Sequence, residues 1–160
     1  MGEYYPAEIH IGGPIRKTAL NKLVKVIVSQ GVSLKDYGEA PADEHSLKEA
    51  FGQATIVKLY DDQASYGQFD ELEAFLVRHR IHFDRHSDAH YEFDAENVNY
   101  RGGKQPTVLH ADQAGNALLD ATEVRDVLND ASLDDPAKIN AIRKLAFPPE
   151  TSSLTPVHLI

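Results

Sequence analysis

The sequence contains no cysteine. This absence excludes disulfide bonds, zinc sites built on thiolates, iron–sulfur clusters and cysteine nucleophiles. A cysteine-free chain suits the reducing environment of the cytoplasm, which is the location we predict. The first residues show no basic segment followed by an apolar run, so we expect no secretory signal.

Long apolar runs and clusters of basic residues are also missing. No apolar stretch approaches the ~20 residues that a membrane-spanning helix needs, so we predict no membrane partner. The 25 Asp and Glu residues outnumber the 16 Lys and Arg residues, which leaves a formal net charge of −9. Nucleic-acid and anionic membrane surfaces are recognised by clustered Lys and Arg. The acidic balance therefore argues against a nucleic-acid partner as well.

The clearest pattern that is present is an alternation over residues 80–94, RIHFDRHSDAHYEFD, with polar residues at the even positions. Successive side chains of a strand point to opposite faces, so the alternation predicts one polar and one mostly apolar face. We predict that the stretch folds back as a hairpin with an odd-numbered loop, because only that register keeps the two faces separate. This register pairs Asp84 with His90 and His82 with Glu92.

The order of the other elements predicts an α+β fold. One mostly antiparallel sheet of about five strands is expected, with helices packed on one face and extra C-terminal helices. A ferredoxin-like core is favoured, and a thioredoxin-like sheet is the alternative. We expect a single domain over residues 1–147 and a Pro/Ser/Thr-rich tail over 148–160 with an apolar end. The predicted strands lie at 7–11, 55–60, 98–100 and 107–111, and the predicted helices at 15–30, 44–51, 69–79, 120–129 and 135–147.

The polar face of the predicted hairpin is the candidate metal site, with His82, Asp84, His90 and Glu92 as ligands. Imidazole and carboxylate groups together bind divalent transition metals such as zinc, manganese, iron or nickel. Alternating polar residues also occur on any strand that has one face in solvent. The alternative interpretation is therefore a solvated sheet face with cross-strand ion pairs and no bound cofactor.

The second candidate is an anion site at the turn that follows the first predicted strand. Gly12 and Gly13 precede a helix whose first residues include Arg16 and Lys17. Free backbone N–H groups at the start of a helix, together with basic side chains, can hold an anion. The turn lacks the Gly-Lys-Ser/Thr ending of a P-loop and the spacing of a dinucleotide fingerprint. A tight strand-to-helix turn is the alternative.

No catalytic motif stands out, and no serine lies in a Gly-x-Ser-x-Gly elbow. The leading hypothesis is a small soluble binding or interaction domain without catalysis, whose small-molecule ligand the sequence does not identify. A metal-binding protein or metal-dependent enzyme is the alternative. We also predict a homodimer, because the apolar end of the tail has no evident place in the chain and could dock on a second copy or on its own sheet. The apolar tail residues are Leu154, Val157, Leu159 and Ile160.

Overall fold

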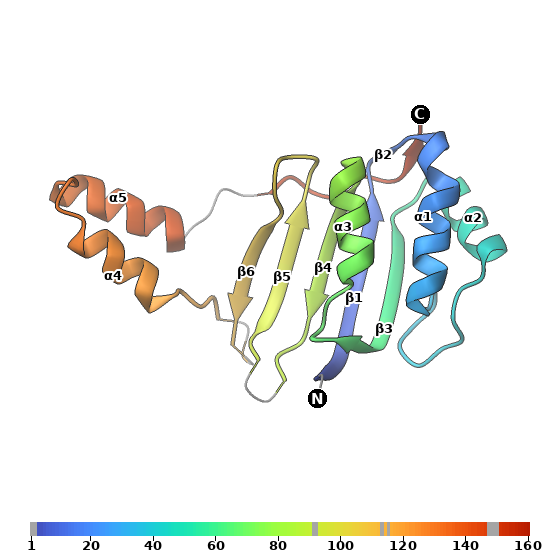
Figure 1. Ribbon diagram of the computed structural model, residues 1–160, viewed down its shortest axis with the longest axis horizontal. Helices are drawn as coiled ribbons and strands as arrows, with labels where there is room; N and C mark the ends of the chain where they lie inside the picture. The colour runs from blue at the N-terminus through green and yellow to red at the C-terminus, as the bar shows by residue number, and fades with distance from the viewer. Residues whose placement is uncertain (1–2, 91–92, 113, 115, 147–150) are drawn as a thin grey trace.

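The computed structural model describes residues 3–90, 93–112, 114, 116–146 and 151–160. A five-stranded antiparallel sheet with the order β3-β1-β4-β5-β6 forms its centre (Figure 1). A short parallel pair lies beside one end of this sheet. The sheet contains β1 (Tyr4–Gly12), β3 (Val57–Ser65), β4 (His82–Ser87), β5 (Ala95–Tyr100) and β6 (Thr107–Ala111), and the pair contains β2 (Pro14–Ile15) and β7 (His158–Leu159).

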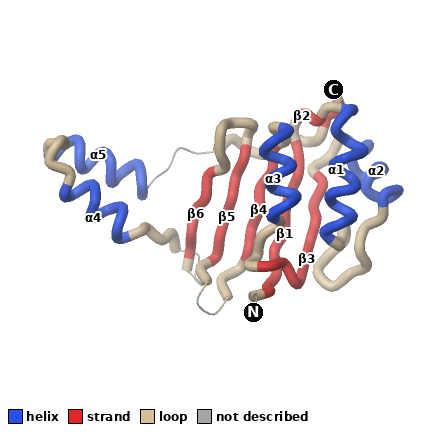
Figure 2. The backbone as a smooth tube through the Cα atoms, viewed as in Figure 1, coloured by secondary structure: helices blue, strands red, loops and turns tan. Residues whose placement is uncertain are grey.

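The first and third helices lie over one face of the sheet, and the second lies beside the first, beyond the edge strand β3 (Figure 2). Leu23 and Ile27 of the first helix, and Leu72 and Leu76 of the third, are buried at a spacing of four residues. Each of these helices therefore presents one apolar stripe to the sheet. Among the described residues, no helix lies over the same face of β5 and β6 (Figure 1). The three helices are α1 (Lys17–Gln30), α2 (Glu44–Gly52) and α3 (Asp70–His79).

The central strand β1 explains why the core forms on that side. Ala7, Ile9 and Ile11 are fully buried under the helices. Glu8 and His10, which alternate with them, are only partly buried on the opposite face. This alternation is what a strand with one covered and one open face requires.

The predicted fold class is confirmed: the structure is α+β, with helices on one face of a five-stranded antiparallel sheet. The ferredoxin-like core is not confirmed. Strands β3 and β4 run parallel, with β1 between them and α3 connecting them, but β4, β5 and β6 then form a simple meander. None of the described helices is both long and apolar enough to cross a bilayer.

The hairpin predicted within residues 80–94 is wrong. Strand β4 pairs with β5, so Asp84 lies opposite Asn99 and not opposite His90. His90 instead forms an isolated antiparallel β-bridge with Phe93. The longer loop gives β4 a partner that can itself pair with β6, which extends the sheet by two strands. The predicted pairing of His82 with Glu92 is not tested, because Glu92 lies outside the described residues.

The C-terminal part of the chain forms an arm and a tail. The arm consists of α4 (Ala121–Asn129) and α5 (Asp135–Ala146), which extend away from β6 (Figure 1). The described part of the tail, residues 151–160, returns to the core and ends in β7. Val157 is 1 % exposed within the hydrophobic core. The tail thus docks on its own domain, and its apolar residues no longer argue for a homodimer.

Candidate functional site

The structure does not bring the predicted metal ligands together. His82 begins β4, whereas His90 follows its last residue and stacks on Tyr5 with 5.4 Å between ring centroids. Because a strand rises by about 3.3 Å per residue, the length of β4 separates the two histidines by more than ~15 Å. Among the described residues, no three His, Asp or Glu side chains are grouped to hold a metal ion. Metal binding stays a prediction, but the pairing of Asp84 with His90 on which it was based is absent.

Asp84 has other partners on the open face of the sheet. Its carboxylate lies 2.7 Å from the guanidinium of Arg101 and accepts a 2.7 Å hydrogen bond from Asn99. Nearby, His10 Nε2 lies 3.3 Å from Glu8 Oε1, and burial lowers the pKa of this histidine. A small hollow of about 90 Å³ lies among these polar side chains. This arrangement is a half-solvated sheet face with polar pairs along and across its strands.

The backbone N–H groups of the predicted anion site are occupied by the tail. The Gly13 N–H donates to the Thr155 carbonyl at 2.9 Å, and the Lys17 N–H donates to Ile160 O at 2.9 Å. A Cβ on Gly12 would lie 2.2 Å from the Thr155 oxygen, so the tail also fills the space beside the turn. An anion could reach these N–H groups only by displacing the tail.

Arg16, from the same prediction, lines a different cavity of about 220 Å³ where the start of α1 meets the end of α3. Three of its lining residues are arginines, a fourth is histidine, and none is acidic. The three guanidinium groups form no hydrogen bond or ion pair with any described residue. We call this site the arginine cavity; it is lined by Arg16, Ala19, Arg78, His79, Arg80 and Ile81.

The backbone at Arg80 is unusual. It adopts the left-handed conformation at the end of α3, with φ 56° and ψ 35°, and its N–H donates to the Leu76 and Val77 carbonyls. Glycine normally occupies this position, because other residues are strained there by roughly 1 kcal/mol. Residues held in such conformations concentrate at functional sites. The basic sequence at 78–80 was visible, but it is also typical of any helix C-terminus, where cations offset the helix dipole.

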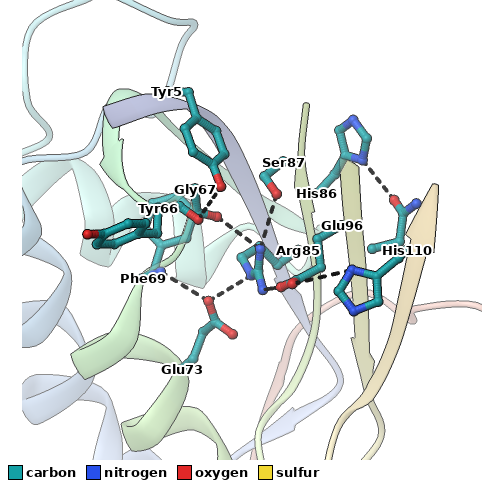
Figure 3. Close-up of polar contacts among 11 residues, drawn as sticks. Tyr5, Tyr66, Gly67, Phe69, Glu73, Arg85, His86, Ser87, Glu96 and His110 are labelled. Carbon is teal, nitrogen blue, oxygen red and sulfur yellow. Dashed lines mark hydrogen bonds and ion pairs between the residues drawn. The ribbon is translucent and has the colours of Figure 1, made fainter. Parts of the chain in front are cut away.

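A second cluster lies under α3 and is organised by a buried arginine (Figure 3). The side chain of Arg85 is 3 % exposed; its Nε lies 2.8 Å from Glu73 Oε1, and its guanidinium also pairs with Glu96. It further donates to the Gly67 carbonyl at 2.9 Å. Burial raises the pKa of Glu73, although the charge of Arg85 opposes this effect. Arg85 therefore joins α3, β5 and the turn before α3.

Beside this cluster is a cavity of about 340 Å³ with aromatic walls. Tyr66 has a left-handed backbone (φ 53°), its carbonyl accepts a 2.8 Å hydrogen bond from Tyr5, and its ring contacts Phe93 edge-on at 5.8 Å. Aromatic faces next to carboxylates are suited to cations. We call this site the aromatic cavity; it is lined by Tyr5, Tyr66, Gln68, Phe93, Asp94, Glu96 and His110.

Sequence reasoning missed both cavities, because each is assembled from separate segments. A usable signal for the cluster beside the aromatic cavity was Arg85, a charged residue among the mostly apolar odd positions of residues 80–94. No protein-family model matches the chain, and neither the curated proteins nor the solved structures compared with it give a match. A larger hollow of about 380 Å³ between α2 and β3 has only Glu49 and Lys58 as charged lining residues, so it concentrates no charge of one sign.

Proposed function

We propose that the protein binds a small anionic ligand, one that carries a phosphate or carboxylate group, in the arginine cavity. The supporting observation is that three arginines, whose guanidinium groups have no partners among the described residues, line a single cavity of about 220 Å³. The positive charges of neighbouring arginines repel one another. A bound anion would be attracted to each of them, and this attraction would offset the repulsion. The planar guanidinium group also presents paired donors that match phosphate and carboxylate oxygens. The proposal is a binding function and includes no chemical step.

The position of the cavity at the start of α1 adds to its attraction for anions. The N-terminal end of a helix carries a partial positive charge, which favours a negative group nearby. Arg16 is the N-cap residue of α1, so its side chain and the helix dipole act on the same space. Of the four residues in the predicted anion site, Arg16 is the one retained in this proposal.

Inorganic phosphate and succinate are suitable probes, because they separate the two anion chemistries. A ligand that binds only the folded protein raises the free energy of unfolding, by about 2.7 kcal/mol when its concentration is 100 times Kd. We expect at least one probe to stabilise the protein against urea, relative to sodium chloride at equal ionic strength. The combined variant Arg16→Gln/Arg78→Gln should lose this stabilisation.

The matched control for this experiment is Lys22→Gln/Lys25→Gln, which removes two positive charges from exposed positions of α1. This control should keep the full stabilisation, because neither lysine lines the cavity. An equal loss in both double variants would show only a general charge effect. That result, or an unchanged response of Arg16→Gln/Arg78→Gln, would refute the proposal.

Arg80→Gly should separate stability from binding. Without ligand, the variant should gain up to about 1 kcal/mol in free energy of unfolding, because glycine adopts the left-handed conformation without strain. The same change removes a guanidinium group from the cavity, so phosphate or succinate should stabilise the variant less. Urea denaturation with and without the probe measures both effects.

Ala54→Gly provides the control for Arg80→Gly. Ala54 is also left-handed (φ 53°), but it does not line the arginine cavity. The Ala54→Gly variant should gain stability in the same way, and phosphate or succinate should stabilise it as much as the wild-type protein. If Arg80→Gly retained the full response as well, Arg80 would have no part in binding.

A further inference from the structure

The two helices of the arm, α4 and α5, pack against each other and have little contact with the other described elements. Neither helix buries a side chain, and Leu128 and Ile139 are 53 % and 59 % exposed. Figure 1 shows the arm extending beyond β6, away from the sheet. Helices of nine and twelve residues are marginal in water unless an apolar face is packed against something. A second surface that covered the exposed apolar side chains would therefore stabilise the arm.

The end of α5 shows which kind of surface this is. Its only acidic residue is Asp135, at the first position, and every later charged residue is basic. Arg143 and Lys144 lie in the last turn, are exposed, and form no ion pair with a described residue. Leu145 follows them directly. The end of the arm thus presents two cations beside apolar side chains.

The aromatic cavity has the complementary chemistry. Asp94 is exposed and has no ion-pair partner among the described residues, and Glu96, whose carboxylate pairs with Arg85, also lines the cavity. The rings of Tyr66 and Phe93 are 43 % and 38 % exposed. A guanidinium or ammonium group is attracted both to an aromatic face and to a neighbouring carboxylate. Val108 on the uncovered half of the sheet is 47 % exposed and offers apolar contact nearby.

We infer that the protein forms a twofold-symmetric dimer in which the basic end of α5 from each copy docks in the aromatic cavity of the other. Each chain has one arm and one cavity, so a pair of copies uses both and leaves neither free. The arm extends away from its own sheet, which places it to reach a second copy (Figure 1). The docked α5 would cover the half of the sheet that α1 and α3 leave open. This dimer is independent of anion binding in the arginine cavity.

Charge reversal on each side tests the inference. The arm variant is Arg143→Glu/Lys144→Glu, and the cavity variant is Gln68→Lys/Asp94→Lys, which leaves the Arg85 cluster unchanged. Sedimentation velocity should find the wild-type protein dimeric and each variant at least about tenfold weaker in self-association, because like charges then face each other. An equimolar mixture of the two variants should form a heterodimer by native mass spectrometry, since every contact in it joins opposite charges.

The heterodimer also demonstrates that both variants fold. A control variant, Lys22→Glu/Lys25→Glu, makes the same charge change on an exposed face of α1 and should remain dimeric. A wild-type protein that stays monomeric at high concentration overturns the inference. So does a dimer that both charge reversals leave intact, or a mixture of folded variants, checked by circular dichroism, that remains monomeric.

Discussion

Replacement of Arg85 with methionine should lower the free energy of unfolding by about 3–5 kcal/mol, the range found when one partner of a buried ion pair is removed. The side chain is almost inaccessible and neutralises both Glu73 and Glu96. Without it, two largely buried carboxylates are left without a counter-charge, and the Gly67 carbonyl loses a donor. Urea denaturation at neutral pH measures the loss.

Two further observations distinguish this mechanism from a simple packing defect. The triple variant Arg85→Met/Glu73→Gln/Glu96→Gln should recover a large part of the lost stability, because it no longer buries unpaired charge. Burial already raises the pKa of Glu73, so protonation favours the folded state. The deficit of Arg85→Met should therefore shrink as the pH is lowered from neutral towards the ordinary carboxyl range.

The matched control is Arg78→Met, on the exposed side of α3. Without added anion, this change should alter stability by no more than about 0.5 kcal/mol, as is usual for surface positions. If Arg85→Met lost as little stability as Arg78→Met, the buried cluster would not be what holds α3 to the sheet.

Gly12→Ala should lower the free energy of unfolding by about 1–3 kcal/mol, the usual cost of forcing an extra carbon into a packed site. The new Cβ would lie 2.2 Å from the Thr155 carbonyl oxygen and 2.9 Å from Leu154 Cγ. The tail would have to move, and the hydrogen bonds between Gly13 and the tail would weaken. Amide exchange at His158 and Ile160, whose N–H groups donate to Gly13 and Ile15, should become faster.

Gly52→Ala is the control for this experiment. Gly52 ends α2, has no heavy atom within 4 Å of an added Cβ, and does not have a positive φ. Alanine should stabilise this position by about 0.5–1 kcal/mol, because it is the better helix former. If Gly12→Ala were equally harmless, the tail would not be packed tightly against the turn.

Local patterns predicted most helices and strands correctly. The helix predicted over 69–79 is observed as α3, Asp70–His79, and Gly31 ends α1 in the left-handed conformation with φ 71°. These features depend on side chains three or four residues apart and on one permissive glycine, so neighbouring residues decide them. Strand β3 continues to Ser65, past the predicted strand end at residue 60, because pairing with β1 at the sheet edge tolerates its polar residues.

The choice of strand partners was not predictable in the same way. The alternation in residues 80–94 correctly indicated one covered and one open face for β4, but it could not identify the strand opposite. Asn99 and not His90 faces Asp84, because the partner of β4 is β5, a strand that also pairs with β6. A strand's period of two specifies its faces and leaves its neighbours open.

The sequence by itself determined the α+β class and the acidic, cysteine-free character of the chain. Only the tertiary structure placed Arg16 beside Arg78 and Arg80, closed the glycine turn with the tail, and gathered Tyr66, Phe93 and Asp94 around one cavity. The physical reason is the range of the contacts involved. Helical and strand periodicity is written in adjacent residues, whereas a cavity depends on which distant segments pack together, and that follows from the burial of the core as a whole.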